Sequence, residues 1–269
     1  MGRTVILSGE PFDEARTHAI LEPFYRDGFA LVPGVLTGVE VEALRARTEE
    51  LMADPSLNGT QFLRTAVNTQ VLWYTHALDP LFGDILVREP MLSLVEAILG
   101  PEPRLCGQNV IRSRTGEGIT VWHVDDMVEF PLPDDIPRHD PRIRLPVFWL
   151  TAQVALTDID TVEHGPTQVV RGSHYSGRPP NDPASPSFEG RGPESILCKA
   201  GDIYLLDHQT WHRGAPNLSD RPRYLLQCQY AKRWATVRFG HPFYARPLPD
   251  HIVDGADERL LRVLRQHPP

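Results

Sequence analysis

Trp122-His123-Val124-Asp125-Asp126 is the stretch that decides how this chain is read, because it places an imidazole and a carboxylate two residues apart. We read it as the end of a β-strand. Side chains at positions i and i+2 project from the same face of a strand, so His123 and Asp125 can converge on one point. They would supply two of the ligands that a metal site needs.

A third ligand is expected far downstream, where the strand-like run 203–206 is followed by His208 and His212. On an extended segment, residues four apart face the same side, so the spacing leaves both histidines open. Two histidines and one carboxylate bound on one face leave positions free on the metal, which is the arrangement of non-haem Fe(II) oxygenases. The pattern therefore indicates oxidative chemistry, with a catalytic zinc site as the alternative.

The composition favours one globular domain that acts on a small molecule. A chain of 269 residues can bury a sizeable core. Its 27 basic and 35 acidic residues give a net charge of −8, which argues against nucleic acid and anionic membranes as partners. The three cysteines form no C-x-x-C pattern, and no apolar run reaches the length of a membrane span. We expect a cytoplasmic protein without disulfides.

The first 102 residues are expected to be rich in helix, because their apolar residues recur at helical spacing. The helices are expected at 13–27, after Thr37, at 81–87 and at 91–99. Thr37 and Glu40 form a capping-box pattern at the start of the second helix. One strand is expected at 29–36, and no regular structure is assigned to 54–76.

After Pro103 the pattern changes to short alternating runs bounded by Gly, Pro, Asn and Asp, which is typical of strands. The strands are expected at 105–112, 119–124, 147–157, 165–170, 196–197, 203–206 and 224–230, with a last helix at 257–265. The predicted fold class is mainly β with flanking helices, around a double-stranded β-helix core of the jelly-roll or cupin type. We expect a single domain over 1–269, with a helix-rich part at 1–102, the jelly-roll core at 103–232 and a C-terminal extension at 233–269.

Two long loops, 127–146 and 175–193, leave the predicted barrel beside Asp125 and beside the turn Gly172-Ser173-His174. Loops of this length are usually functional or disordered, and a loop beside a metal ligand is well placed to cover a substrate. We therefore expect lids. The first loop mixes acidic and basic residues, and the sequence shows no basic cradle for a nucleotide phosphate. This favours a polar or amphiphilic small molecule over a polyphosphate as substrate.

Four ordered motifs extend the pattern over most of the chain. They are 26–36, 122–125, 165–174 and 211–217. Together they resemble the phytanoyl-CoA dioxygenase family of Fe(II)- and 2-oxoglutarate-dependent oxygenases, from about Glu22 to Tyr230. The resemblance implies Fe(II) as cofactor, 2-oxoglutarate and O2 as cosubstrates, and hydroxylation of a small molecule with release of succinate and CO2. An enzyme of secondary metabolism would fit this chemistry.

The resemblance also implies roles for single residues. His123, Asp125 and His212 would hold the iron, which leaves His208 as a surface histidine or as a support for a ligand. In the family, an arginine eleven residues after the distal histidine binds the 2-oxoglutarate C5 carboxylate, and here that position is Arg223. A guanidinium offers a planar fork that matches a carboxylate. Arg221 is the alternative, but it precedes Pro222 and is expected in the turn.

Two glutamines on expected strands, Gln108 and Gln153, are further candidates for contact with the cosubstrate. Each could instead be a hydrogen-bonded glutamine of the barrel. His174 is expected to belong to a structural turn. A zinc hydrolase and a non-catalytic jelly-roll binding protein are the alternative functions, and iron-dependent binding of 2-oxoglutarate would distinguish them from an oxygenase.

Overall fold

The strands of the computed structural model, which describes residues 9–236 and 249–264, form two antiparallel sheets. The larger sheet has the order β1 (Phe29–Val32), β8 (Ile203–Asp207), β5 (Trp149–Ala155), β10 (Arg223–Ala231), β4 (Arg104–Ser113), β3 (Thr69–Trp73) and β2 (Leu63–Ala66). The smaller sheet has the order β7 (Pro193–Ser195), β6 (Thr167–Val170) and β9 (His212–Gly214). Two facing sheets of this kind confirm the predicted jelly roll.

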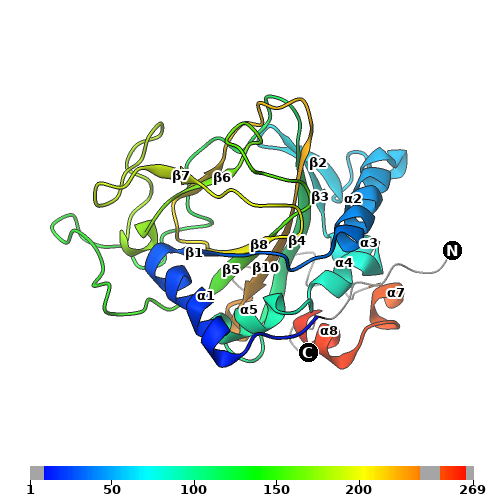
Figure 1. The fold of residues 1–269 in the computed structure, drawn as a ribbon, viewed down its shortest axis with the longest axis horizontal. Coiled ribbons are helices and arrows are strands. Elements are labelled where there is room, and N and C mark those ends of the chain that lie inside the picture. Colours follow the sequence, from blue (N-terminus) through cyan, green and yellow to red (C-terminus); the bar gives the residue numbers. More distant parts are fainter. Residues whose placement is uncertain (1–8, 237–248, 265–269) are drawn as a thin grey trace.

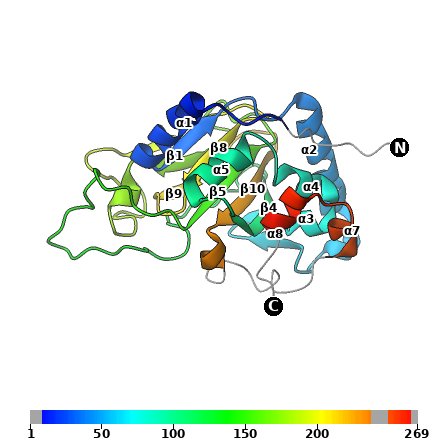
Figure 2. The same cartoon turned by 90° about the horizontal axis from the view of Figure 1, so that it is seen from below.

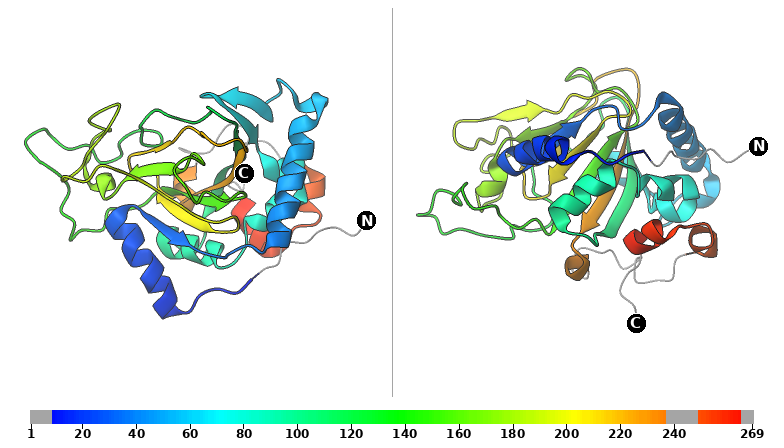
Figure 3. Two further views of the ribbon diagram at one scale, coloured as in Figure 1. Left: turned by 45° about the horizontal axis from the view of Figure 1, so that its top comes forward. Right: turned by 60° about the horizontal axis from the view of Figure 1, so that its bottom comes forward.

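Helices cover the outer face and one end of the larger sheet (Figures 1 and 2). They are α1 (Glu14–Asp27), α2 (Gly38–Ala53), α3 (Thr75–Leu78), α4 (Pro80–Ile85), α5 (Met91–Leu99), α7 (Asp250–Val253) and α8 (Glu258–Leu264), with short 3-10 turns at Pro55–Leu57, Ser173–Tyr175 and Arg233–Ala235. α5 packs on β5, and α8 packs on β4. The helical layer lies on the opposite side of the larger sheet from the smaller sheet (Figure 3). No helix in the described ranges is long and apolar enough to cross a membrane.

The N-terminal helices begin and end where the sequence predicts. The Thr37 hydroxyl accepts a hydrogen bond from the Glu40 amide at 3.3 Å, and the Glu40 carboxylate accepts from the Thr37 amide at 2.8 Å, so the capping box is formed. α1 ends at Gly28, which has a φ of +87°. A Cβ at Gly28 would lie 2.1 Å from the Thr210 hydroxyl oxygen, so only glycine fits between α1 and the β8–β9 connection.

Alternation along β10 separates the core from the barrel interior. Tyr224, Leu226, Cys228 and Tyr230 pack in the main hydrophobic core. The residues that alternate with them face the barrel interior, where Arg223, Leu225, Gln227 and Gln229 line a cavity. Because side chains alternate strictly along a strand, one strand carries both the helical packing and the wall of the site.

The segment 54–76 corrects the expectation of irregular structure, because it contains the hairpin β2–β3 at the edge of the larger sheet. Val67 and Asn68 form its two-residue turn with φ values of +45° and +61°. Turns with two positive φ values usually carry Asn-Gly or Asp-Gly. Because Val67 occupies the first turn position, the sequence lacks the usual signal of a hairpin.

The strand expected at 119–124 is also wrong. This segment runs beside 212–217 without forming a regular strand: Gly116 donates to the Asn217 carbonyl, Gly214 donates to the Ile119 carbonyl, and His123 forms an isolated bridge with His212. Gly118 approaches the Ala215 carbonyl so closely that a Cβ would lie 2.7 Å from its oxygen. Scattered hydrogen bonds between 116–123 and 212–217 therefore replace the regular strand pairing that was expected.

Other boundaries differ less. The expected strand 29–36 ends at Val32, because Pro33 and Gly34 turn the chain. The strand expected at 196–197 lies slightly earlier, as β7, and the final helix ends at Leu264, with Arg265 outside the described residues. The first 102 residues supply three strands, β1 to β3, to the larger sheet in addition to their helices.

Candidate metal and cosubstrate site

The side chains of His123, Asp125 and His212 converge at the mouth of the barrel. One ligand atom from each lies within 4.8 Å of the others, and each histidine Nε2 is 3.7 Å from Asp125 Oδ1. The two imidazole ring centres are 4.2 Å apart. These three are the residues expected from the sequence, and the fold brings them together although β9 lies far from 123–125 in the chain.

Both histidines are oriented by the backbone. His123 Nδ1 lies 2.8 Å from the Val121 carbonyl oxygen, and His212 Nδ1 lies 2.8 Å from the Thr210 carbonyl oxygen. A carbonyl can only accept, so each Nδ1 carries the proton and each Nε2 presents a lone pair to the centre. Burial lowers the pKa of His212, which keeps its imidazole neutral. Neutral imidazoles with fixed tautomers are prepared to bind a divalent metal.

Arg223, at the start of β10, is buried without an acidic partner in the part of the chain that the structure describes. Its Nη1 donates to the Gly165 carbonyl and its Nη2 donates to the Ser113 hydroxyl at 3.0 Å, while Nε has no hydrogen-bond partner. No carboxylate of the described residues forms an ion pair with this guanidinium. Burial lowers its pKa, because the charged form is poorly solvated. An unpaired buried charge is costly, so the site fits an anionic ligand.

One cavity of about 200 Å³ joins the metal-binding side chains to Arg223. Its lining includes all three convergent residues and Gln153, together with the hydrophobic side chains of Trp73, Ile111, Ile119 and Leu225. Arg223 is therefore placed so that an anion could reach both the guanidinium and the metal position. A dicarboxylate that chelates a metal has the chemistry that this cavity requires.

The two glutamine candidates lie on different faces. Gln153 lines the cavity, and its Oε1 is buried without a hydrogen-bond partner within residues 9–236 and 249–264. Gln108 is turned to the helical layer, where its amide donates to the Phe82 carbonyl at 2.7 Å and accepts from the Thr75 hydroxyl at 3.0 Å. The expectation of a cosubstrate contact at Gln108 is corrected, because the pleat gives its neighbour Asn109 to the cavity instead.

Asn109 and Gln227 are cavity residues that the sequence did not single out. Asn109, Gln227 and Gln153 are register partners across β4, β10 and β5, and Asn109 donates to the Gln227 side chain at 2.6 Å. The Asn109 Oδ1 is buried without a partner among the described residues. Only strand pairing reveals this row of amides, since nothing in the local sequence separates Asn109 from Gln108.

The other candidate residues from the sequence, His208, Arg221 and His174, do not line the cavity. His208 is fully buried and its Nε2 is 3.0 Å from Glu129, at the root of the loop 127–146. Burial lowers the pKa of His208, but the hydrogen bond to Glu129 and the charge of Asp207 raise it more, so the net pKa is raised. Arg221 is exposed and pairs with Asp160 at 3.8 Å. His174 Nε2 lies 3.1 Å from the Tyr25 carbonyl in a structural turn, as expected.

Comparison with known sequences places the chain in the oxygenase family that its motifs resemble. The family model described as phytanoyl-CoA dioxygenase (PhyH) matches residues 24–225. The ectoine dioxygenase of Halomonas elongata is 28% identical over 249 residues, which is 82% of this chain and 71% of that protein. The ectoine dioxygenase of Bordetella parapertussis is 26% identical over 296 residues, 97% of this chain and 89% of that protein.

Solved structures share the fold. The non-haem alpha ketoglutarate dependent epimerase SnoN from nogalamycin biosynthesis superposes with a TM-score of 0.64, at 22% identity over 82% of this chain and 85% of SnoN. HygX from Streptomyces hygroscopicus, solved with nickel and 2-oxoglutarate bound, gives a TM-score of 0.60, at 23% identity over 79% of this chain and 86% of HygX. Both likenesses confirm the jelly-roll architecture.

A jelly roll with two histidines, one carboxylate and a buried arginine in one cavity has the arrangement expected of a non-haem Fe(II)- and 2-oxoglutarate-dependent oxygenase. Because the family model covers most of the chain, this protein belongs to the phytanoyl-CoA dioxygenase family. Its reaction class is therefore oxidation with Fe(II), 2-oxoglutarate and O2, as the sequence motifs implied.

Proposed function

We propose that His123, Asp125 and His212 bind Fe(II) in this protein and that Arg223 binds the C5 carboxylate of 2-oxoglutarate. The observation that carries the proposal is the shared cavity, which is lined both by the three converging side chains and by a buried guanidinium that has no carboxylate partner among the described residues. Bound iron would supply the activation of O2. The protein residues hold the metal, fix the direction of the cosubstrate through the arginine fork and exclude bulk water.

The substrate that we propose is a small polar molecule with hydrogen-bond donors. Two buried acceptors, Asn109 Oδ1 and Gln153 Oε1, belong to side chains that line the cavity and have no partner among the described residues. Buried acceptors without partners are costly, and a ligand N–H or O–H would satisfy them. The relatives named ectoine dioxygenase support a polar substrate of this size. Hydroxylation is the proposed outcome.

A succinate-release screen tests the proposal. The purified chain is incubated with Fe(II), ascorbate, 2-oxoglutarate and air, and a library of polar small molecules that includes ectoine is compared with an apolar set. We expect donor-bearing compounds to stimulate succinate formation and to gain one oxygen atom. Equal activity with zinc, or activity without O2 and 2-oxoglutarate, would instead support the hydrolytic alternative.

A further inference from the structure

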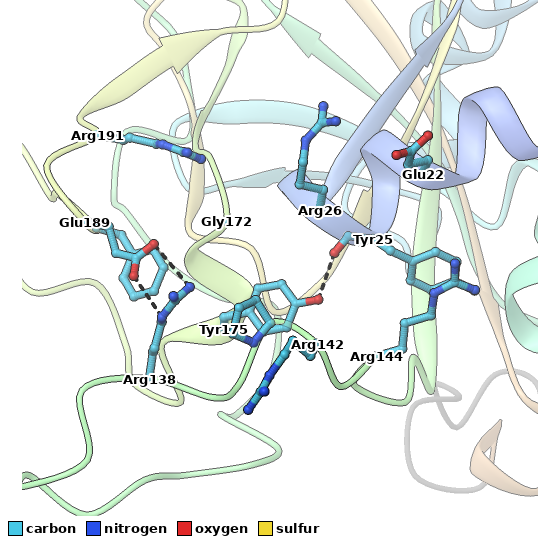
Figure 4. Close-up of a pocket in the computed structure, with 12 residues that line it drawn as sticks. Glu22, Tyr25, Arg26, Arg138, Arg142, Arg144, Gly172, Tyr175, Glu189 and Arg191 are labelled. Carbon is cyan, nitrogen blue, oxygen red and sulfur yellow. Dashed lines mark hydrogen bonds and ion pairs between the residues drawn. The ribbon is translucent and has the colours of Figure 1, made fainter.

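A second cavity of about 310 Å³ lies outside the barrel, between α1 and the two long loops (Figure 4). It shares no lining residue with the barrel cavity. A buried cluster packs Trp122 and Trp211, the neighbours of two proposed iron ligands, together with Tyr175 and Phe188, which line the second cavity. The proposed function uses none of this space, so the cavity requires its own explanation.

Five arginines from three separate segments line the second cavity. They are Arg26 of α1, Arg138, Arg142 and Arg144 of the loop 127–146, and Arg191 of the loop 175–193, with Glu22 and Glu189 as the acidic lining residues. Figure 4 shows these side chains around Tyr25 and Tyr175. The sequence shows no basic cradle because its parts are far apart in the chain, and only the fold assembles it.

Three of the arginines are already paired with carboxylates. Arg26 is 2.6 Å from Asp27, Arg138 is 2.9 Å from Glu189, and Arg142 pairs with Asp140.

The other two have no such partner in the described ranges. The Arg144 guanidinium lies over the Tyr25 ring, 4.2 Å from its centre, and no carboxylate pairs with Arg144 or Arg191. Two cations without a carboxylate partner among the described residues therefore line one hollow, and both side chains are exposed, so an anion from solution can reach them.

The walls of the cavity are built rather than loose. Arg178 of the second loop donates to the carbonyls of Pro133 and Ile136 at 2.6 Å and of Pro137 at 3.2 Å in the first loop. Gly177 has a φ of +62°, and a Cβ there would lie 2.7 Å from Leu132, so glycine permits the two loops to touch. A preorganised pocket loses less entropy when it binds a ligand.

We propose that this second cavity binds a small molecule carrying a phosphate group, at a site separate from the catalytic barrel. Guanidinium forks that approach from three segments suit a tetrahedral oxyanion, which offers oxygens in several directions, better than they suit a single carboxylate. The loop 127–146 begins two residues after Asp125, and Gln209 holds it there by accepting from the Glu129 amide and donating to the Met127 carbonyl, both at 2.9 Å. Phosphate binding would therefore further restrain the loop that begins beside the proposed iron ligands.

Calorimetric titration of the metal-free full chain tests this site independently of catalysis. The probes are inorganic phosphate and glucose 6-phosphate, which distinguish free phosphate from a phosphate ester, with succinate as the carboxylate comparison. We expect at least one phosphate probe to bind in preference to succinate. Arg144→Gln and Arg191→Gln should each weaken it by roughly tenfold, and the double variant should weaken it by roughly a hundredfold.

Arg45→Gln is the matched control, because Arg45 pairs with Glu42 on the exposed face of α2, away from both loops. It should bind the phosphate probe like the unmodified chain. The bound probe should also slow proteolysis of both loops in the unmodified chain and not in the double variant. Absence of phosphate binding, equal binding of succinate, or unchanged binding in the double variant would overturn the proposal, while the iron and 2-oxoglutarate assignments would stand.

Discussion

His123 and His212 exchange a pair of backbone hydrogen bonds, with N···O distances of 3.0 and 2.9 Å, and this pairing holds their imidazole ring centres 4.2 Å apart at the mouth of the barrel. The proposed iron ligands are thus held by main-chain pairing as well as by side-chain orientation. A site placed on paired backbone moves little when metal binds, and this rigidity helps to keep the correct geometry.

Alanine at His123, Asp125 or His212 should remove Fe(II) binding and turnover together, because each residue supplies one of the three bonds to the metal. The backbone pair is independent of the side chains, so the melting temperature of the metal-free protein should change little. Anaerobic equilibrium dialysis with Fe(II) and thermal denaturation measure the two effects. Iron binding and turnover retained by Asp125→Ala would show that the ligand set is different.

His208→Ala separates the two histidines that the sequence left open. The change should preserve iron binding but leave the buried Glu129 carboxylate without its imidazole partner. Breaking a buried pair in this way costs about 3 kcal/mol or more of the free energy of unfolding. Denaturant titration should show this loss, and Glu129→Gln in the same background should recover part of it. If His208→Ala loses iron while His212→Ala keeps it, the distal ligand is His208.

Arg223→Ala should raise the KM for 2-oxoglutarate by roughly 30-fold or more, since losing a buried charge-assisted pair costs at least about 2 kcal/mol. Arg223→Lys should recover only part, because an ammonium lacks the fork. Without cosubstrate, Arg223→Met should be at least as stable as the unmodified protein, since an uncompensated buried charge is removed. Arg221→Ala is the control, and a large KM effect there instead would exchange the roles of the two arginines.

The sequence predicts which proposed metal and cosubstrate residues lie together better than it predicts the rest of the cavity lining, and the reason is physical. His123 and Asp125 lie two residues apart, so their convergence is local, and the offset from His212 to Arg223 spans one turn and the start of one strand. Gln108 and Asn109 are adjacent amides on β4, and a single step along the pleat sends one to the helices and the other to the cavity. Which of the two amides faces the cavity depends on the register of β4, and that register is set by the strands that pair with it.

Longer-range assembly is still harder to predict. Sequence patterns miss the hairpin β2–β3 because Val67 occupies a turn position that usually carries Asn or Asp. The arginine cavity is missed because Arg26, Arg144 and Arg191 meet only after two irregular loops have folded against α1. The loops have no periodic sequence pattern, so the sequence does not indicate which of their side chains will lie close together.

Leucine at Gln153 should impair substrate use without destabilising the fold. The Gln153 Oε1 is buried and unpartnered, so its removal should leave the free energy of unfolding unchanged or slightly raised, while the KM for the donor-bearing substrate rises. Gln108→Leu is the matched comparison on β4. It breaks the bonds to Phe82 and Thr75 and should lower stability by about 1 to 3 kcal/mol with little effect on KM. The opposite pattern would place the substrate away from the amide row.

The loop 127–146 should act as a lid over the barrel, because it begins beside Asp125 and Glu129 fastens it to His208 and Gln209, which directly follow β8. Both long loops project from the end of the molecule that lies opposite α2 (Figure 1). If the first loop closes over the barrel, proteases should cut it readily in the metal-free protein and slowly once Fe(II), 2-oxoglutarate and substrate are bound.

Arg178→Ala tests the lid without shortening it, because this guanidinium holds three carbonyls of the first loop in place. The variant should lose the ligand-induced protection and should uncouple the reaction, so that succinate still forms while oxidised product falls, since an open site admits water. Arg45→Gln again serves as the surface control. Mass spectrometric mapping of the cleavage sites and the ratio of succinate to product measure both effects. Equal cleavage with and without ligands, together with unchanged coupling in Arg178→Ala, would show that the loop has no part in closure and would direct the search for substrate contacts to the segment 58–76.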